Sequence, residues 1–260
     1  GLRVEAHDPQ CLALHRGESG PRAVEGPLAS SPRANVVRAR ADGVERVVKV
    51  RPPRQPIGTR VGAKRPRFGL PAVDRRLRRE DFVPSVYRSL AFADTALPLE
   101  HGEAMLKPVV EGRILQALDL NASDDLLEIG TGSGYLSACL AYLANSVTSI
   151  DIHAGFIETA RPRLVAAGAG NVRLEVGDAL EWNAGRQFDA VCVGGAVADI
   201  PQRFLDWVKP GGRLFIIRGQ APAQEALRMT RRGDAWHTES LFETDIPYLH
   251  GMAPVQRFAL

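Results

Sequence analysis

The stretch from Leu126 to Tyr135, which reads Leu-Leu-Glu-Ile-Gly-Thr-Gly-Ser-Gly-Tyr, decides how this chain folds. It joins a short apolar run to three alternate glycines, Gly130, Gly132 and Gly134, and then to a second apolar run. A short apolar run bounded by turn residues is typical of a buried strand. Glycines allow positive φ angles and let a ligand approach the backbone, and the start of a following helix offers free N–H groups. The stretch therefore predicts a strand, a ligand-binding loop and a helix in succession.

Two residues of this stretch restrict the kind of ligand. A dinucleotide fingerprint, G-x-G-x-x-G, would need a glycine where Tyr135 stands. Glu128 lies just before the glycines, and its carboxylate would repel a pyrophosphate but attract a cationic amino group. We therefore expect a ligand that carries an ammonium group rather than a diphosphate.

Strand patterns alternate with helix patterns downstream of the glycines. Strands are predicted at 125–129, 146–150, 171–176, 188–193 and 213–217, and helices at 133–144, 153–167 and 202–208. This spacing indicates an α/β fold with a mostly parallel twisted sheet and helices on both faces. The runs 226–232 and 236–244 flank a Gly-Asp turn and predict an antiparallel hairpin at one edge of the sheet.

Three further elements are predicted around this core. Residues 75–87 indicate a helix that ends in a turn at Pro84. Residues 103–118 have apolar positions at helical spacing, with Pro108 in the first turns, where proline is best tolerated. Residues 210–212, Pro-Gly-Gly, predict a turn before the last parallel strand.

Acidic residues follow three successive strands. Glu128 stands near the end of the first strand, Asp151 ends the second, and Asp178, within Gly-Asp-Ala, follows the third. In open α/β sheets the ligand lies at the carboxyl ends of the strands, where an acid accepts hydrogen bonds from ribose hydroxyls. This places Asp151 at a ribose and Asp178 at an adenine amino group. The alternative is that Asp151 and Asp178 only cap the helices that follow them.

Charge is distributed unevenly along the chain. The 33 Lys+Arg and 30 Asp+Glu give a net charge of +3, but residues 1–80 hold 18 and 8 of them, and residues 81–260 hold 15 and 22. Residues 1–74 are rich in Arg, Pro and Gly and contain one aromatic residue, Phe68. We expect this segment to be disordered or loosely packed, followed by one domain at 75–260. A basic arm for nucleic acid is the alternative, which the lack of aromatic residues among the arginines disfavours.

The composition excludes several other classes of protein. With 45 % hydrophobic and 24 % charged residues the chain is ordinary globular material. It contains no apolar run long enough for a transmembrane helix and no apolar secretory leader, so no membrane partner is expected. Cys11, Cys139 and Cys192 lie far apart, which predicts neither a zinc site nor a disulfide framework and favours a reducing, cytoplasmic compartment.

Five segments resemble the S-adenosylmethionine-dependent methyltransferases of the Rossmann-like class and, within it, the protein-L-isoaspartate O-methyltransferases. They are REDFVPSVYRSLAFADTALPL (79–99), LLEIGTGSGYLSACLA (126–141), RPRLVAAGAGNVRLEVGDAL (161–180), FDAVCVGGAVADIP (188–201) and KPGGRLFIIRG (209–219). The resemblance covers about residues 75–260. It implies a methyltransferase fold and an enzyme that methylates the α-carboxylate of isoaspartyl residues in damaged proteins, as a step of protein repair.

The resemblance also implies which residues bind the cofactor S-adenosylmethionine. The methionine end would lie against Glu128, Gly130, Gly132 and Gly134. Asp151 would bind the ribose, and Asp178 with the backbone of Ala179 would bind the adenine.

The substrate loop departs from the resemblance. The family loop normally reads G-x-G-Q-T-I-S-Q-P, whereas residues 100–108 read Glu-His-Gly-Glu-Ala-Met-Leu-Lys-Pro. Ala104 and Leu106 replace the usual hydroxyls, and Glu103 and Lys107 replace the glutamines. Lys107 could pair with an acceptor carboxylate, whereas Glu103 would oppose one. A different methyl acceptor, or a non-catalytic cofactor-binding module, therefore remain alternatives.

No catalytic acid–base set is expected, because a carboxylate acceptor has no proton to remove and catalysis depends on positioning and exclusion of water. His101 and His153 are candidate bases, but a surface or loop role is the simpler interpretation. Gly194 and Gly195 stand where Thr-Ala is common in the family that the chain resembles. Their small size either leaves room beside the methyl group or serves close packing. The substrate-loop candidates are thus Lys107, His101 and Gly195; the oligomeric state is not set by the sequence.

Overall fold

The computed structural model describes residues 35–41, 44–50 and 77–255. The chain divides into two compact units, Gly1–Gly62 and Ala63–Leu260. In the first unit, β1 (Asn35–Ala41) pairs with β2 (Val44–Val50) in an antiparallel register. This strand pair was not predicted from the sequence. The rest of the 1–74 segment lies outside the described residues, so its predicted disorder stays a prediction.

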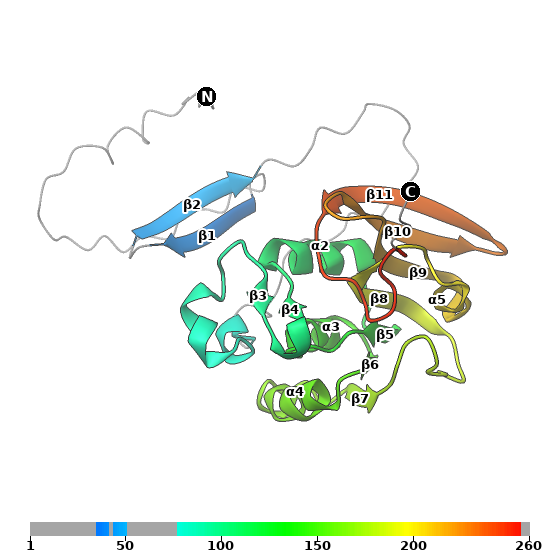
Figure 1. The fold of residues 1–260 in the computed structure, drawn as a ribbon, viewed down its shortest axis with the longest axis horizontal. Helices are drawn as coiled ribbons and strands as arrows, with labels where there is room; N and C mark the ends of the chain where they lie inside the picture. The colour runs from blue at the N-terminus through cyan, green and yellow to red at the C-terminus, as the bar shows by residue number, and fades with distance from the viewer. Residues whose placement is uncertain (1–34, 42–43, 51–76, 256–260) are drawn as a thin grey trace, which may run out of the picture. The chain divides into compact units, whose positions relative to one another are not determined.

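The second unit is built on a seven-stranded sheet with the order β11-β10-β9-β8-β5-β6-β7 (Figure 1). Its strands are β5 (Asp125–Ile129), β6 (Ser146–Asp151), β7 (Val172–Val176), β8 (Phe188–Val197), β9 (Val208–Arg218), β10 (Gln224–Arg232) and β11 (Ala235–Thr244). The strands β5 to β9 pair in parallel, and β10 and β11 are antiparallel. This confirms the predicted α/β sheet with an antiparallel hairpin at one edge.

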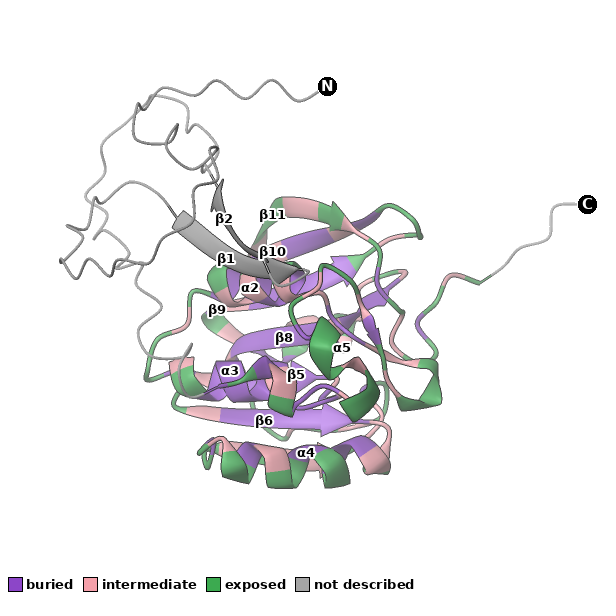
Figure 2. Cartoon of the chain, turned by 90° about the vertical axis from the view of Figure 1, so that its left-hand side faces the viewer, coloured by how far each residue is buried: buried purple, intermediate pink, exposed green. Residues whose placement is uncertain are grey.

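Helices cover both faces of the sheet. Three of them, α2 (Pro108–Leu118), α3 (Tyr135–Leu143) and α4 (Ala154–Ala166), pack on one face, and the short α5 (Gln202–Asp206) packs on the other. Because successive side chains of a strand point to opposite faces, Leu126 joins the core under α2 and α3, whereas Leu127 joins the core with Phe204. Figure 2 shows β6, β8 and α3 largely buried, while much of α4 is exposed.

The chain between Leu97 and Pro108 differs from the helix predicted at 103–118. It forms β3 (Leu97–Pro98), a 3₁₀ turn η4 (Glu100–Gly102) and β4 (Ala104–Met105), and α2 begins only at Pro108. Proline is well suited to the first position of a helix and forces the preceding residue out of the helical region. Lys107 is accordingly extended, with φ −61° and ψ 142°. The prediction of helix over 103–107 was wrong.

Two other local predictions need correction. Residues 75–87 do not form one α-helix, because the described part holds two 3₁₀ helices, η2 (Arg79–Asp81) and η3 (Ser85–Leu90), separated at Pro84. The predicted turn at 210–212 is a bulge within β9. Val208 lies opposite Phe188 but Arg213 lies opposite Ala190, which leaves extra residues on β9.

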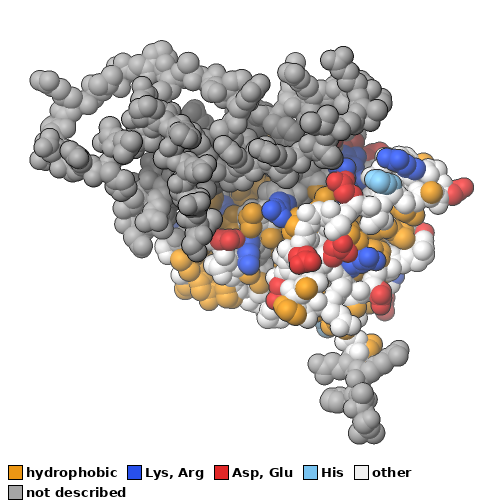
Figure 3. Space-filling view, turned by 90° about the horizontal axis from the view of Figure 1, so that it is seen from above, with side chains coloured by type: hydrophobic (Ala, Val, Ile, Leu, Met, Phe, Trp, Pro, Cys, Tyr) orange, Lys and Arg blue, Asp and Glu red, His pale blue; other side chains and the backbone are white. Residues whose placement is uncertain are grey.

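Three general expectations can be compared with the described residues. Cys139 and Cys192 are buried and unpaired, and burial raises the pKa of the Cys139 thiol to about 12. Within residues 35–41, 44–50 and 77–255, every helix is too short or too polar to cross a membrane. Figure 3 shows basic and acidic side chains interspersed over the described residues of one face, with no continuous basic patch in that view.

Candidate active site

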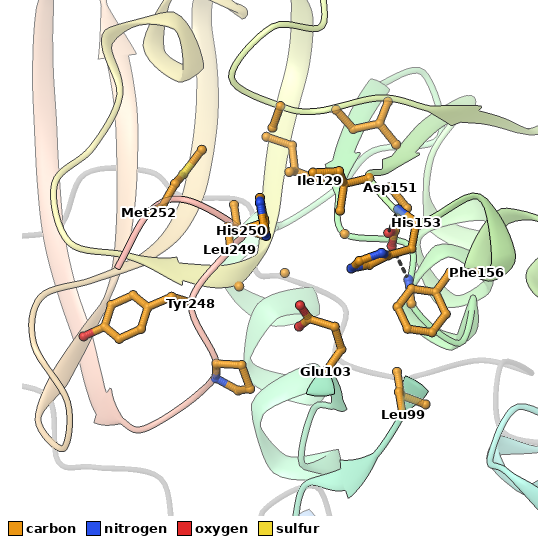
Figure 4. Close-up of a pocket in the computed structure, with 18 of the residues that line it drawn as sticks. Leu99, Glu103, Ile129, Asp151, His153, Phe156, Tyr248, Leu249, His250 and Met252 are labelled. Atoms are coloured by element: carbon orange, nitrogen blue, oxygen red, sulfur yellow. Dashed lines mark hydrogen bonds between the residues drawn. The ribbon is translucent and has the colours of Figure 1, made fainter. Parts of the chain in front are cut away.

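A crevice opens at the carboxyl ends of the parallel strands. Its cavity volume is about 100 Å³. Its floor comes from the loop after β5 and from the ends of β6, β7 and β8, and its walls come from the 99–106 segment and from the C-terminal segment 247–252 (Figure 4). Of the predicted site residues, those that line it are Gly130, Gly132, Asp151, His153, Asp178, Ala179 and Gly195.

The three glycines after β5 have different roles. All have positive φ angles, of 93° at Gly130, 50° at Gly132 and 85° at Gly134. Gly130 and Gly132 line the crevice, where the lack of a side chain exposes the backbone to a ligand. Gly134 does not line it. A Cβ at Gly134 would lie 2.9 Å from the Cβ of Ala160, so this glycine lets α4 pack against the loop.

Asp151 fixes the shape of the crevice floor. Its Oδ2 accepts a hydrogen bond from the Gly132 N–H at 2.9 Å, and its Oδ1 accepts one from the His153 N–H at 2.9 Å. The side chain therefore ties the glycine loop and the start of α4 to the end of β6. Asp151 makes no capping hydrogen bond within α4, whose N-cap is His153. It lines the crevice, and its contact with a ribose stays a prediction.

Asp178 occupies the corresponding position after β7. Its Oδ1 accepts a hydrogen bond from the Leu180 N–H at 2.8 Å, which closes a turn rather than capping a helix. The neighbouring Gly177 is also required by packing, since a Cβ there would lie 2.7 Å from Cδ1 of Trp182. Asp178 and Ala179 thus reach the crevice from a tight, well-anchored turn.

Glu128 does not line the crevice. It is fully buried, and its Oε2 accepts hydrogen bonds from Ser137 Oγ at 2.5 Å and Ser149 Oγ at 2.6 Å. Strand alternation explains this, because Ile129 takes the crevice-facing position and Glu128 points under α3. Burial raises the pKa of Glu128 to about 7, against the lowering effect of the two hydroxyls. These two hydrogen bonds hold α3 to β6, while Oε1 has no hydrogen-bond partner among the described residues. The contact with a ligand ammonium stays a prediction.

Of the three substrate-loop candidates, only Gly195 lines the crevice. Lys107 lies at the start of α2, and neither Lys107 nor His101 lines the crevice. The His101 ring stacks on the His153 ring with centroids 4.1 Å apart, and both rings meet the edge of Phe156. Glu103 does line the crevice, and Figure 4 shows its carboxylate pointing into it. Burial raises the pKa of Glu103.

The C-terminal segment forms a wall that the sequence did not predict. Leu249 N donates to Ala196 O at 2.8 Å and Ala196 N donates to Pro247 O at 2.9 Å, so the segment lies beside the end of β8 in a single parallel β-bridge. A Cβ at Gly195 would lie 2.7 Å from Cδ2 of Leu249. Of the two roles considered for Gly195, the geometry supports close packing. The paired glycines 194–195 were the one signal in the sequence that another segment packs closely against the end of β8.

The residues of the crevice fit S-adenosylmethionine. Three carboxylates line it, from Glu103, Asp151 and Asp178, whereas no lysine or arginine of the described chain does. Such a lining favours a cation over a pyrophosphate. A side-chain-free cradle at Gly130 and apolar surface from residues such as Ile129, Ile152, Phe156 and Met252 suit an amino-acid moiety joined to a nucleoside. Fold and crevice together define the class of S-adenosylmethionine-dependent methyltransferases.

Comparison with known proteins identifies the family. The family model described as protein-L-isoaspartate(D-aspartate) O-methyltransferase matches residues 71–246, and the chain belongs to this family. The chain is 39 % identical over 171 residues to the protein-L-isoaspartate O-methyltransferase of Myxococcus xanthus, covering 64 % of this chain and 81 % of the relative. It is 38 % identical over 159 residues to that of Methylorubrum populi, covering 61 % and 74 % of the two chains.

Solved structures agree on the fold. A beta-aspartate methyltransferase from Plasmodium falciparum, solved in complex with S-adenosyl-L-homocysteine, superposes with a TM-score of 0.58 at 18 % identity over 67 % of this chain and 86 % of that chain. A second protein-L-isoaspartate O-methyltransferase gives a TM-score of 0.59 at 21 % identity over 68 % of this chain and 59 % of that chain. At these identities the similarity supports the fold alone.

Proposed function

We propose that this protein transfers the methyl group of S-adenosylmethionine to the α-carboxylate of isoaspartyl residues in proteins and peptides. The observation that carries the proposal is the crevice itself, in which the glycine loop and two strand-end carboxylates face the 99–106 segment. Membership of the protein-L-isoaspartate O-methyltransferase family supports the same reaction and acceptor.

The cofactor would be held by backbone on one side and by carboxylates on the other. Gly130 and Gly132 would receive the methionine part, where no side chain intervenes. Each oxygen of Asp151 accepts one backbone N–H and keeps a lone pair, so the group can still accept a ribose hydroxyl. Asp178 and the Ala179 backbone would receive the adenine.

Bound S-adenosylmethionine supplies a methyl group that its sulfonium has already activated. The chain's own residues then need to orient the acceptor in line and to keep water out. Leu99, Leu249 and Met252 form apolar walls around the crevice, which serve the second task. No residue is required as a base, because a carboxylate acceptor carries no proton; the stacked pair His101–His153 therefore has no proton-transfer step to perform.

The methyl ester formed in this reaction explains how the enzyme would serve protein repair. A methyl ester at an isoaspartyl residue is attacked by the neighbouring backbone nitrogen, which releases methanol and closes a succinimide. Water then opens the ring, in part to a normal aspartyl linkage. Isoaspartyl proteins and peptides are thus the proposed partners, and protein repair the proposed role.

The substrate loop offers one observation in favour of a second candidate, a methyltransferase with a different carboxylate acceptor. Leu106 and Ala104 bring no hydroxyl to the crevice wall, and Lys107 lies away from it. An acceptor carboxylate that approaches this wall would therefore meet Glu103 rather than a hydroxyl or a cation.

The test is to compare an isoaspartyl peptide with the same peptide in which the α-carboxylate is replaced by a carboxamide, using methyl-labelled S-adenosylmethionine. We expect label only in the carboxylate peptide, in a form released by alkali as methanol. Alkali-stable label, or equal labelling of the carboxamide, would show that the acceptor atom is not this carboxylate oxygen.

A further inference from the structure

Glu103 presents its carboxylate to the crevice from the wall formed by the 99–106 segment. It stands between η4 and β4, where its backbone is fixed by two hydrogen bonds, from Glu103 N–H to Glu100 O at 3.1 Å and from Leu99 N–H to Glu103 O at 2.8 Å. Figure 4 shows the carboxylate between His153 and Phe156 on one side and Leu249 and His250 on the other. The side chain is thus presented to whatever occupies the crevice.

The Glu103 carboxylate lacks a compensating partner among the described residues. It takes part in no side-chain hydrogen bond, and burial raises its pKa. The titratable groups around it come from three other elements or segments: Asp151 at the end of β6, His153 before α4, and His250 of the C-terminal segment. His101 of the same loop also acts on it. Asp151 raises the pKa of Glu103 further, whereas the histidines lower it.

The proposed acceptor is itself an anion. An ionised Glu103 would repel an incoming carboxylate, because two negative charges would meet in the half-buried crevice. A protonated Glu103 would instead donate its O–H to that carboxylate, forming a strong charge-assisted hydrogen bond. The same side chain therefore changes from a repulsive group to a binding group when it gains one proton.

We propose that Glu103 selects the acceptor by charge: a carboxylate binds productively only while Glu103 carries a proton. This inference rests on the proposed function and names the residue that sets its pH range. Acceptor binding is then strongest on the acidic side and weakens as the pH rises through the titration of Glu103. Protonated histidines would act in the same direction, so the test must separate Glu103 from His153 and His250.

The Glu103→Gln variant makes this separation, because glutamine keeps the size and a donor N–H but never ionises. We would measure kcat and KM for an isoaspartyl peptide as a function of pH, starting below the ordinary carboxyl pKa of about 4.3 and extending to about pH 9. The wild type should lose kcat/KM toward high pH through a rising KM. Glu103→Gln should keep its low KM across the range, so its kcat/KM should exceed that of the wild type at the alkaline end.

Glu100→Gln is the matched control, since Glu100 lies three residues away, is exposed and does not line the crevice. It should keep the wild-type profile. Calorimetry at the alkaline end should show that the S-adenosylhomocysteine complex of Glu103→Gln binds the peptide more tightly than the complexes of the wild type and of Glu100→Gln. An unchanged pH profile in Glu103→Gln would overturn the inference while leaving the proposed function intact. If no protein methylates or binds the peptide at any pH, although each binds S-adenosylhomocysteine, the proposed function fails and the inference falls with it.

Discussion

Asp151→Asn is the sharpest single perturbation of the cofactor side of the crevice. Asp151 uses one oxygen for the Gly132 N–H and the other for the His153 N–H, both at 2.9 Å. Asparagine has one oxygen and one NH₂ group, so whichever way it lies, one backbone donor faces another donor. A hydrogen bond to a charged group contributes about 1.5–3 kcal/mol, and the proposed ribose acceptor loses its charge as well.

This magnitude sets the expected change in affinity. Since each 1.4 kcal/mol corresponds to a factor of ten, S-adenosylhomocysteine should bind about 10- to 100-fold more weakly to Asp151→Asn. Isothermal titration calorimetry measures this directly, and circular dichroism shows whether the variant is folded. The control is Asp125→Asn at the start of β5, where the carboxylate bonds to Ser146 and Asn145 and does not line the crevice.

Two results would refute the reasoning on Asp151. Wild-type affinity in a folded Asp151→Asn protein would show that the carboxylate neither shapes the loop nor meets the ligand. An equal loss of affinity in Asp125→Asn would show that any loss of sheet-end charge has the same effect, and that the crevice position of Asp151 is irrelevant.

Three further predictions follow from single residues. Gly132→Val should abolish S-adenosylhomocysteine binding, because φ is 50° there and the residue lines the crevice. The control is Gly185→Val, which carries similar backbone strain at a φ of 62° but lies outside the crevice and should still bind. Calorimetry on both variants checks this prediction. Arg79→Met should lower the free energy of unfolding in urea by about 3–5 kcal/mol, because it leaves the buried Glu111 carboxylate without its partner at 2.9 Å, and adding Glu111→Leu should recover part of the loss. Glu128→Gln should remove a pH dependence of stability: the folded pKa of about 7 lies above the ordinary 4.5, so the contribution of neutral Glu128 is complete below 4.5 and is lost as the pH rises through 7. Over that range the wild type without cofactor should therefore lose up to about 3 kcal/mol more stability than the variant, which keeps the similar contribution of Glu111.

Strand and helix patterns predicted most of the methyltransferase unit. The alternation after Gly134 gave β6, α4 and β7 within a few residues, because each has an uninterrupted apolar pattern and a local stop signal. The 103–107 region failed because Leu106 happens to continue the helical spacing of α2, while the local constraint of Pro108 on its predecessor decides the backbone.

The candidate site shows the same division between local and long-range information. Asp151 and Asp178 could be placed from the sequence, since both directly follow strands whose carboxyl ends meet at one edge. The three glycines after β5 look alike in sequence, and only the proximity of Ala160 separates Gly134 from the others. The C-terminal wall depends on backbone pairing between Ala196 and Leu249, for which no local pattern exists.

The central claim is that the crevice methylates an isoaspartyl carboxylate. The most direct test is transfer of labelled methyl from S-adenosylmethionine to two peptides of identical composition, one with an isoaspartyl and one with an aspartyl linkage at the same position. We expect label in the isoaspartyl peptide and only background in its aspartyl twin. Equal labelling of both peptides, or none in a folded sample that binds S-adenosylhomocysteine, would contradict it.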